Sequence, residues 1–333
     1  MMMSPVAGGE KRRSLMLQSA MGAAIAEALA DPLVAEVMVN ADGSLRLDRL
    51  GQGIVDTGLR LPVADVERII RLIATQSGTE IDAARPILSA ALVVAPDKGR
   101  VRFEGLLPPV AAAPCFSIRK PATRHYGLAA YVRDRIMTPD QAGLLRQAVW
   151  QRRNILIAGG TSSGKTTLAN ALLAEIARCQ ERIIVIEDTR ELVCDAADHL
   201  TLCSRPGIAS LRDLVRSSLR LRPDRIVIGE VRGAEALDLL KAWNTGHPGG
   251  IATLHANSAA ASLQRLEQLV QEAVPHVPRG LIAEAIDLIV FLAGKGAGRH
   301  LAAIESLDGI DADGRYRLRR LAAAPAGTCT GGA

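Results

Sequence analysis

A glycine-rich stretch with a single lysine holds the residues best suited to chemistry. It matches the pattern G-x-x-x-x-G-K-[ST] in full and reads Gly159-Gly160-Thr161-Ser162-Ser163-Gly164-Lys165-Thr166-Thr167. The glycines let the backbone turn tightly enough for N–H groups to face phosphate oxygens, and a helix that starts there adds positive potential. Lys165 would reach the β- and γ-phosphates, and the Thr166 hydroxyl would ligate Mg²⁺. The stretch therefore predicts a binding site for ATP and Mg²⁺.

Carboxylates follow two of the predicted strands farther along the chain. One strand ends in Ile186-Glu187-Asp188-Thr189-Arg190-Glu191, and the next ends in Gly229-Glu230. Parallel sheets carry their active sites at the carboxyl ends of strands, so Glu187, Asp188 and Glu230 are candidate Mg²⁺ ligands. Glu187 and Glu230 both qualify as the catalytic base that activates water, and the sequence leaves open which one does. The alternative for the first group is that its acids only cap the next element.

A histidine follows a third predicted strand, Gly250 to Leu254. This residue, His255, would lie beside the glycine-rich stretch and donate a hydrogen bond to the γ-phosphate, a partner that hydrolysis removes. The alternative is that the histidine has only a structural role. His247, in the preceding glycine-rich turn, fits that interpretation better. Its place at the end of a strand makes His255 a candidate catalytic residue.

Three arginines recur at helical spacing in the segment Ser210 to Arg220. Arg212, Arg216 and Arg220 would form a stripe on one side of the helix. Most such stripes are solvated, and the alternative here is a surface that contacts a neighbouring subunit or supplies an arginine to its site.

The elements that must position these residues alternate between strands and helices from residue 141 onward. Such alternation of apolar strands and helices predicts a mainly parallel sheet in an α/β domain over residues 141–321. The predicted strands are Asn154 to Ala158, Arg182 to Glu187, Arg225 to Gly229, Gly250 to Leu254 and Ala285 to Phe291. The predicted helices are Gln141 to Gln151, Lys165 to Ala177, Ser210 to Arg220, Ala234 to Asn244 and Ala259 to Glu272, and a terminal hairpin covers Leu301 to Leu321.

A smaller α+β domain is predicted before this one, over residues 15–120. Its helices are Leu15 to Ala30 and Val63 to Ser77, and its strands are Val34 to Val39, Leu45 to Arg49, Gly53 to Thr57, Leu92 to Val94, Val101 to Leu106 and Cys115 to Arg119. Residues 1–14 are expected to form a flexible lead, 121–140 a linker and 322–333 a disordered tail.

The composition excludes several classes of protein. Apolar residues make up 48% of the 333 residues, which is typical of a folded soluble protein, and no run of 18 apolar residues predicts a membrane span. The five cysteines form no C-x-x-C pair, so neither a disulfide framework nor a four-cysteine zinc site is expected, and a cytoplasmic location fits. Only 2% of residues are aromatic, which argues against direct nucleic-acid binding through base stacking.

The glycine-rich stretch, the two segments that carry carboxylates and the segment that carries His255 form four blocks. With these four blocks in order, the chain resembles the type IV secretion traffic ATPases. The likeness is strongest to the TrbB class of conjugal transfer proteins, within the superfamily that includes GspE and PilT. It rests on Gly159 to Thr167, Ile186 to Glu191, Leu219 to Gly233 and Gly246 to Asn257. The Gly-Glu pair at 229 and 230, where many P-loop enzymes have an aspartate first, is what this family shows.

The resemblance implies a hexameric ring of RecA-like P-loop motor domains that hydrolyse ATP bound between the two domains of a subunit. It further implies that Arg102 and Arg119 of the N-terminal domain contact the nucleotide phosphates; from the residues themselves they would be ordinary strand-edge arginines. A cytoplasmic protein, peripheral on the inner membrane, would then use inter-domain motion to power channel or pilus assembly and substrate transfer. Its partners would be other copies of the chain and further components of the transfer machinery.

Three rival functions remain open at this point. A pilus or type II secretion ATPase would share the four blocks, although many of the latter carry a four-cysteine insertion that this chain lacks. A nucleic-acid translocase is disfavoured by the scarce aromatic residues and by a charge that is spread evenly along the chain. A scaffold that binds ATP without hydrolysing it is disfavoured by the two carboxylates, Glu187 and Glu230.

Overall fold

The computed structural model describes residues 5–49, 52–93, 100–120, 126–205 and 207–323, and it divides the chain into two compact units. They are Met1–Thr123 and Arg124–Ala333. Parts of three predicted segments therefore lie outside the described residues: positions 1–4 of the lead, 121–125 of the linker and 324–333 of the tail. Val94, the end of one predicted strand, lies outside them too.

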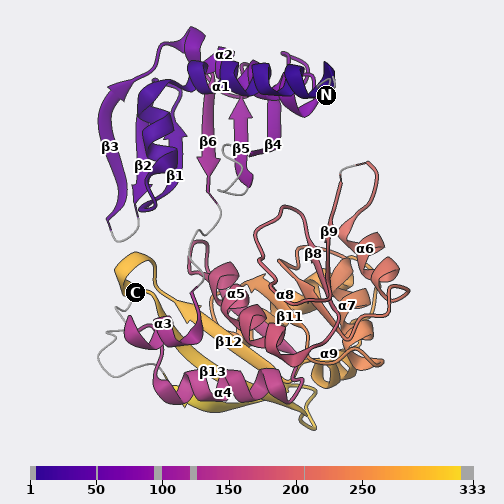
Figure 1. Cartoon of the computed structure of the whole chain (residues 1–333). Helices are drawn as coiled ribbons and strands as arrows, with labels where there is room; N and C mark the ends of the chain where they lie inside the picture. The colour runs from indigo at the N-terminus through magenta and orange to yellow at the C-terminus, as the bar shows by residue number, and fades with distance from the viewer. Residues whose placement is uncertain (1–4, 50–51, 94–99, 121–125, 206, 324–333) are drawn as a thin grey trace. The chain divides into compact units, whose positions relative to one another are not determined.

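In the first unit, two helices pack against an antiparallel sheet (Figure 1). The strand order is β3-β2-β1-β6-β5-β4. Helix α2 turns the apolar residues Val66, Ile69, Ile70 and Ile73 to the core at the spacing of one helix face. The elements are α1 (Pro5–Ala30), β1 (Val34–Val39), β2 (Ser44–Arg49), β3 (Gly53–Arg60), α2 (Val63–Ser77), β4 (Ile87–Val93), β5 (Arg100–Leu106) and β6 (Cys115–Arg119).

Three elements of this unit differ clearly from the prediction, and one of them is β3, which extends to Arg60 instead of ending at Thr57. Helix α1 starts at Pro5 rather than Leu15, so residues 5–14 of the predicted lead are helical, and Gly22 interrupts the helix with φ 70°. The glycines at 8 and 9 have low helix propensity and concealed the earlier start. Strand β4 starts at Ile87, five residues before the predicted Leu92. The prediction missed its first half, Ile87-Leu88-Ser89-Ala90, because polar and apolar residues there show no clear period.

The second unit is built on one mixed sheet with the order β14-β13-β12-β7-β11-β10-β8-β9. The strands from β12 to β9 in this order pair in parallel, and β13 and β14 add an antiparallel edge. The strands are β7 (Ile155–Gly159), β8 (Ile183–Glu187), β9 (His199–Cys203), β10 (Arg225–Ile228), β11 (Ile251–His255), β12 (Leu288–Ala293), β13 (His300–Ile310) and β14 (Tyr316–Ala323). The helices are α3 (Leu128–Arg133), α4 (Pro139–Trp150), α5 (Lys165–Ile176), α6 (Leu211–Ser218), α7 (Glu235–Asn244), α8 (Ala259–Gln271) and α9 (Arg279–Ala285), with short 3₁₀ turns at Ala177–Cys179 and Gly296–Gly298.

Both faces of this sheet are covered at its centre, which explains why strands β7, β8 and β10 are buried at every position. Alternate residues of each strand point to opposite faces. In β7, Leu156 and Ala158 join the core under α6, α7, α8 and α9, whereas Ile155 and Ile157 join the core under α3, α4 and α5. A strand buried on both faces cannot show polar alternation, so continuous apolar runs predicted this part of the sheet correctly.

The second unit also differs from the prediction in several elements. The predicted linker 121–140 contains α3 and the start of α4, which a Thr138 capping box begins. Strand β9 and helix α9 were not predicted, because β9 is short and half polar and α9 covers only seven residues. Helix α6 ends at Ser218 instead of Arg220, and β12 starts at Leu288 instead of Ala285.

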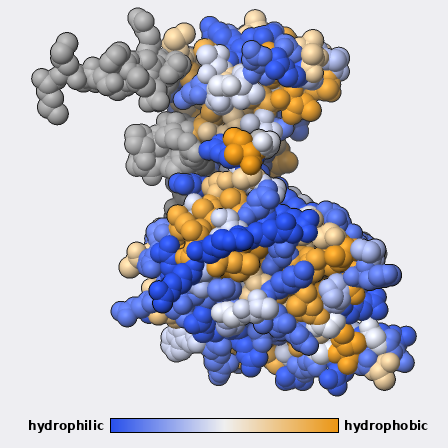
Figure 2. Space-filling model, turned by 90° about the vertical axis from the view of Figure 1, so that its right-hand side faces the viewer, coloured by the Kyte–Doolittle hydropathy of each residue, from blue (hydrophilic) through white to orange (hydrophobic). Residues whose placement is uncertain are grey.

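Within the described residues, no helix has the length and hydropathy needed to cross a bilayer. On the face of the second unit turned to the viewer in Figure 2, hydrophilic side chains predominate and hydrophobic ones form small separate patches. Scattered apolar residues of this kind are normal on a protein surface.

Candidate nucleotide site

The P-loop joins β7 to α5, as the sequence predicts, and it needs glycine at two of its positions. A Cβ at Gly159 would lie 2.5 Å from the Ser163 Oγ and 2.7 Å from the Leu292 backbone oxygen, which leaves no room for a side chain. Gly164 has φ +93°, a left-handed conformation that costs other residues free energy. Gly164 is also the N-cap of α5, so the first turn of that helix directs its N–H groups toward the loop.

Lys165 lies buried at the centre of the loop, with 7% of its surface exposed. Its Nζ donates to the backbone oxygens of Gly159 and Gly160, each at 3.0 Å, and lies 3.2 Å from Nδ1 of His255. A buried ammonium requires such partners because an unpaired charge is expensive to desolvate. The two backbone oxygens are uncharged acceptors, and phosphate oxygens in their place would add a charge–charge attraction to the hydrogen bonds.

His255 links this lysine to the second carboxylate group. Strand β11 pairs with β7, which sets His255 opposite Gly159, and His255 Nε2 lies 2.8 Å from Glu230 Oε1. The other oxygen of Glu230 accepts a 2.5 Å bond from Arg232, whose guanidinium also lies 3.4 Å from Asp188. Lys165, His255, Glu230, Arg232 and Asp188 therefore form one continuous polar chain across the carboxyl ends of neighbouring strands.

Glu187, at the end of β8, is the most deeply buried carboxylate of the site. It is 3% exposed, and one oxygen accepts backbone N–H groups of Glu191 and Leu192 at 2.9 and 3.0 Å. Its other oxygen has no hydrogen-bond partner among the described atoms. Burial raises the pKa of Glu187 to about 7, although the two N–H groups lower it. Gly229 approaches so closely that a Cβ there would lie 3.0 Å from the Glu187 Cβ, which accounts for the glycine at that position.

The candidate Mg²⁺ ligands do not form a ready-made metal site. Among the described residues, no cluster of three His, Cys, Asp or Glu side chains could hold a metal ion. Thr166 Oγ1 lies 3.5 Å from Glu191 Oε2, and Asp188 accepts a bond from the Ser204 hydroxyl. The donor set still fits Mg²⁺, because this ion takes one or two protein oxygens and completes its shell with water and phosphate.

Arg102 and Arg119 belong to the first unit and lie directly opposite each other on β5 and β6. Residues that face each other across an antiparallel pair share one side of the sheet, so these two side chains start from the same face. Like charges in such a pair repel unless an anion or another partner compensates them.

The arginine stripe is braced within the second unit. Arg212 and Arg216 both donate to the carboxylate of Asp238 on α7, at 2.7 and 3.1 Å, and the Asp238 side chain is 13% exposed. Arg220 lies beyond the end of α6 and bonds to the Arg216 backbone oxygen. Two of the three arginines therefore hold α6 to α7.

Arg299 is a contact of the P-loop that sequence reasoning missed. It follows the 3₁₀ turn after β12, and its Nη2 donates to the Ser162 backbone oxygen at 3.2 Å. Its guanidinium lies 3.1 Å from the position a Gly164 Cβ would take. The only signal for it in the sequence is its place after a strand that pairs with β7, and strand pairing is not readable from the sequence.

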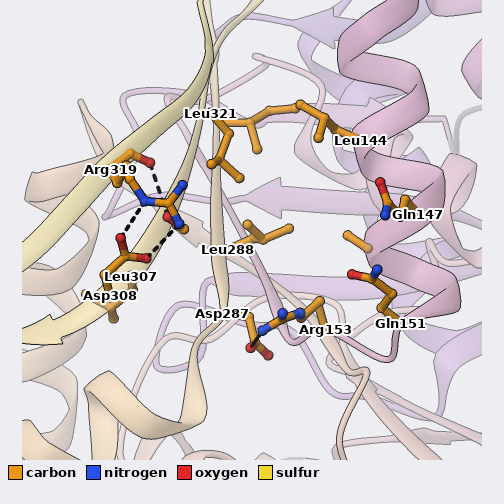
Figure 3. A pocket seen from close by; sticks show the side chains of 13 residues that line it. Leu144, Gln147, Gln151, Arg153, Asp287, Leu288, Leu307, Asp308, Arg319 and Leu321 are labelled. Carbon is orange, nitrogen blue, oxygen red and sulfur yellow. Dashed lines mark hydrogen bonds and ion pairs between the residues drawn. The ribbon is translucent and has the colours of Figure 1, made fainter.

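Two pockets lie at opposite ends of this sheet. One, of about 400 Å³, is lined by Glu230, Val231, Arg232, Leu254, His255 and Arg265 and adjoins the site. The other, of about 300 Å³, lies between α4 and strands β12 to β14, where Leu144, Leu288 and Leu321 line it and the pairs Arg153–Asp287 and Arg319–Asp308 flank it (Figure 3). Leu288 pairs with the first residue of β7, so this second pocket is remote from the P-loop.

Comparison with known proteins gives one consistent set of relatives. Residues 40–295 match the family model described as type II/IV secretion system protein. A probable conjugal transfer protein TrbB of Sinorhizobium fredii (strain NBRC 101917 / NGR234) is 46% identical over 304 residues, 91% of each chain. The type IV secretion system protein PtlH of Bordetella pertussis (strain Tohama I) is 36% identical over 318 residues, covering 84% of this chain and 92% of that one.

The fold is similar to that of two solved structures. The pilus retraction motor PilT with bound ADP aligns with a TM-score of 0.60 at 19% identity, over 89% of this chain and 80% of that one. The ATPase DotB of Legionella pneumophila aligns with a TM-score of 0.57 at 21% identity, over 89% and 78%. At these identities the likeness concerns the fold only.

Proposed function

Because the chain belongs to the type II/IV secretion system protein family, we propose that it is an ATPase that powers conjugal transfer through a type IV secretion system. The observation that carries this proposal is the buried Lys165, which neutral oxygens and His255 surround in a complete P-loop. The similarity to TrbB proteins over most of both chains supports conjugal transfer over the pilus and type II alternatives.

ATP and Mg²⁺ fit the described residues as follows. P-loop N–H groups from Gly159 to Thr167 and the Lys165 ammonium would bind the phosphates, and Thr166 would bind Mg²⁺, which neutralises charge developing on the phosphate oxygens. Glu230 and His255 would face the γ-phosphate, because His255 contacts both Lys165 and Glu230. Asp188 would complete the metal site through water once Arg232 releases it.

Glu187 is the better candidate for the catalytic base. A general base works best when its pKa lies near the operating pH, and burial raises the pKa of Glu187 to about 7. It also keeps one oxygen free of hydrogen bonds within the described structure. Glu187 would accept a proton from water as the water oxygen bonds to the γ-phosphorus and the bond to the bridging oxygen breaks. The products are ADP and inorganic phosphate.

We further propose that the active form is a homohexameric ring of RecA-like domains, in the cytoplasm at the inner membrane. Hydrolysis would remove the γ-phosphate contacts of Lys165 and His255 and so change the relation between the two units. The mainly parallel sheet with a P-loop at its carboxyl edge supports the RecA-like assignment. Arg102 and Arg119 stay predicted phosphate contacts.

Substitution of the P-loop lysine tests the proposal. Lys165→Ala should abolish ATP binding and lower phosphate production at least 100-fold, an effect of about 3 kcal/mol on the barrier. It should also stop DNA transfer from a donor cell whose conjugation depends on this chain. Lys241→Ala is the matched control, because Lys241 is an exposed lysine on α7. Hydrolysis by Lys165→Ala at the wild-type rate would refute the proposal.

A further inference from the structure

Arginine side chains outnumber carboxylates in the lining of the pocket of about 400 Å³ beside the site. Arg232 and Arg265 face it together with His255, and Glu230 is the carboxylate in its lining. Glu230 is already engaged by His255 and Arg232 at 2.8 and 2.5 Å. The pocket is therefore suited to an anion rather than to a cation or an apolar group.

Arg265, on α8, contributes a guanidinium with spare donors. It donates to the side-chain oxygen of Gln268 at 3.1 Å, and within the described part of the chain no carboxylate forms an ion pair with it. Arg279 differs in this respect, because its Nε and Nη2 both donate to the Glu267 carboxylate and its Nη1 donates to the Gly314 backbone oxygen. A planar guanidinium with unused N–H groups is the side chain that best matches a phosphate in charge and geometry.

The pocket is connected to the place where the γ-phosphate would lie. His255 borders both the γ-phosphate position and the pocket, since it lies 3.2 Å from Lys165 Nζ and also lines the pocket. An anion released beside Lys165 would thus pass His255 and meet Arg232 and Arg265 without leaving the protein. The remaining lining, from Val231 and Leu254, is apolar and offers no competing ligand.

We propose that this pocket binds the inorganic phosphate produced by hydrolysis, with Arg265 as its principal ligand, before the phosphate leaves the protein. This inference rests on the proposed ATPase activity. Occupancy of the pocket draws Arg232 from Glu230 toward the phosphate, so the ion pairs among Glu230, Arg232 and Asp188 re-form only after phosphate departs. Phosphate release, rather than bond cleavage, then returns the site to the arrangement described above.

Binding of radiolabelled inorganic phosphate can be measured with a non-hydrolysable ATP analogue and Mg²⁺ filling the γ-phosphate position. Wild-type protein should bind phosphate, and Arg265→Ala should weaken this binding about tenfold, because a charge-assisted bond contributes roughly that factor. The phosphate affinity of Arg265→Lys should lie between those of the wild type and Arg265→Ala. Lysine keeps the positive charge but lacks the planar guanidinium with its paired N–H groups. Gln264→Ala, an exposed neighbour on α8, should bind as the wild type does.

Kinetics on the same variants separates this proposal from the previous one. In a single turnover, acid-quenched cleavage of ATP by Arg265→Ala should match the wild type, whereas phosphate release should be faster. If the wild type cleaves ATP but Arg265→Ala binds phosphate unchanged, the pocket does not hold phosphate. If Arg265→Ala loses cleavage itself, Arg265 acts on ATP and the pocket assignment is again wrong. A wild type that does not cleave ATP would instead overturn the proposed function.

Discussion

The Lys165 ammonium binds atoms of the protein itself at the place where a phosphate would lie in the proposed function. Two backbone oxygens and a histidine nitrogen surround its ammonium at 3.0 to 3.2 Å, so the lysine is already positioned before phosphate arrives. In the proposed function, phosphate oxygens would replace the two uncharged backbone oxygens with negatively charged acceptors, which attract the ammonium more strongly.

Because of Glu187, the free energy of unfolding of the protein should fall as pH rises. Its pKa in the fold is about 7 against an ordinary value of 4.5, so the unfolded chain loses the proton first. Stability attributable to this residue is full below pH 4.5 and is lost progressively up to about pH 7. Glu187→Gln removes the charge and should be more stable than the wild type at pH 8, by at most about 3 kcal/mol, with little difference at pH 4.5.

Urea unfolding at the two pH values measures this effect, and the same variant reports on catalysis. The rate of ATP cleavage should fall at least 100-fold in Glu187→Gln, because an amide cannot accept the proton. Wild-type cleavage should rise as pH increases through about 7. A stability difference between variant and wild type that is equal at both pH values would show that burial does not raise the pKa of Glu187.

Among the elements, α6 and α7 are joined by Asp238, which accepts bonds from Arg212 and Arg216. Asp238→Ala would leave two positive charges one turn apart on α6 without their common partner. We expect it to lower the free energy of unfolding by about 2 kcal/mol, the usual effect of losing hydrogen bonds to a charged group. Arg216→Ala should cost less than about 1 kcal/mol, because Arg216 is half exposed.

Urea denaturation of both variants, combined with ATPase rates, decides between the two interpretations of the arginine stripe. A structural brace predicts that Asp238→Ala loses stability and keeps its ATPase rate below the melting temperature. Loss of the ATPase rate at unchanged stability would indicate instead that these arginines serve a neighbouring subunit.

For the whole molecule, the open question is whether the first unit contributes to nucleotide binding. Arg102 and Arg119 form a cross-strand pair whose charges suit an anion. If Arg119 contacts phosphate, Arg119→Ala should weaken ATP binding about tenfold, the effect of one charge-assisted bond. It should leave AMP binding less affected. Arg68→Ala is the control, since Arg68 is an exposed arginine on α2 that pairs with Asp65.

Titration of a fluorescent ATP analogue, with and without added salt, provides the measurement. Weaker binding should be specific to Arg119→Ala and should decrease the salt dependence of ATP affinity. Equal affinity in Arg119→Ala and Arg68→Ala would remove the first unit from the nucleotide site and leave its arginines as ordinary strand residues.

The sequence by itself determined those features that depend on neighbouring residues. The P-loop was readable because Gly159, Gly164 and Lys165 must follow one another at fixed spacing to wrap phosphate. Strands β7, β8 and β10 were readable because burial on both faces makes them apolar almost throughout. Short or half-polar elements such as β9 and α9 were missed, since a few residues carry little periodic signal.

Only the tertiary structure decided which of these residues meet. Lys165, His255, Glu230 and Glu187 follow β7, β11, β10 and β8, which are neighbours in space but not in chain order. Their contacts, the approach of Arg299 to Gly164 and the raised pKa of Glu187 all depend on strand order and burial. These features arise from packing between segments far apart in the chain, such as Ser162 and Arg299 at a separation of 137 residues, and no local pattern encodes them.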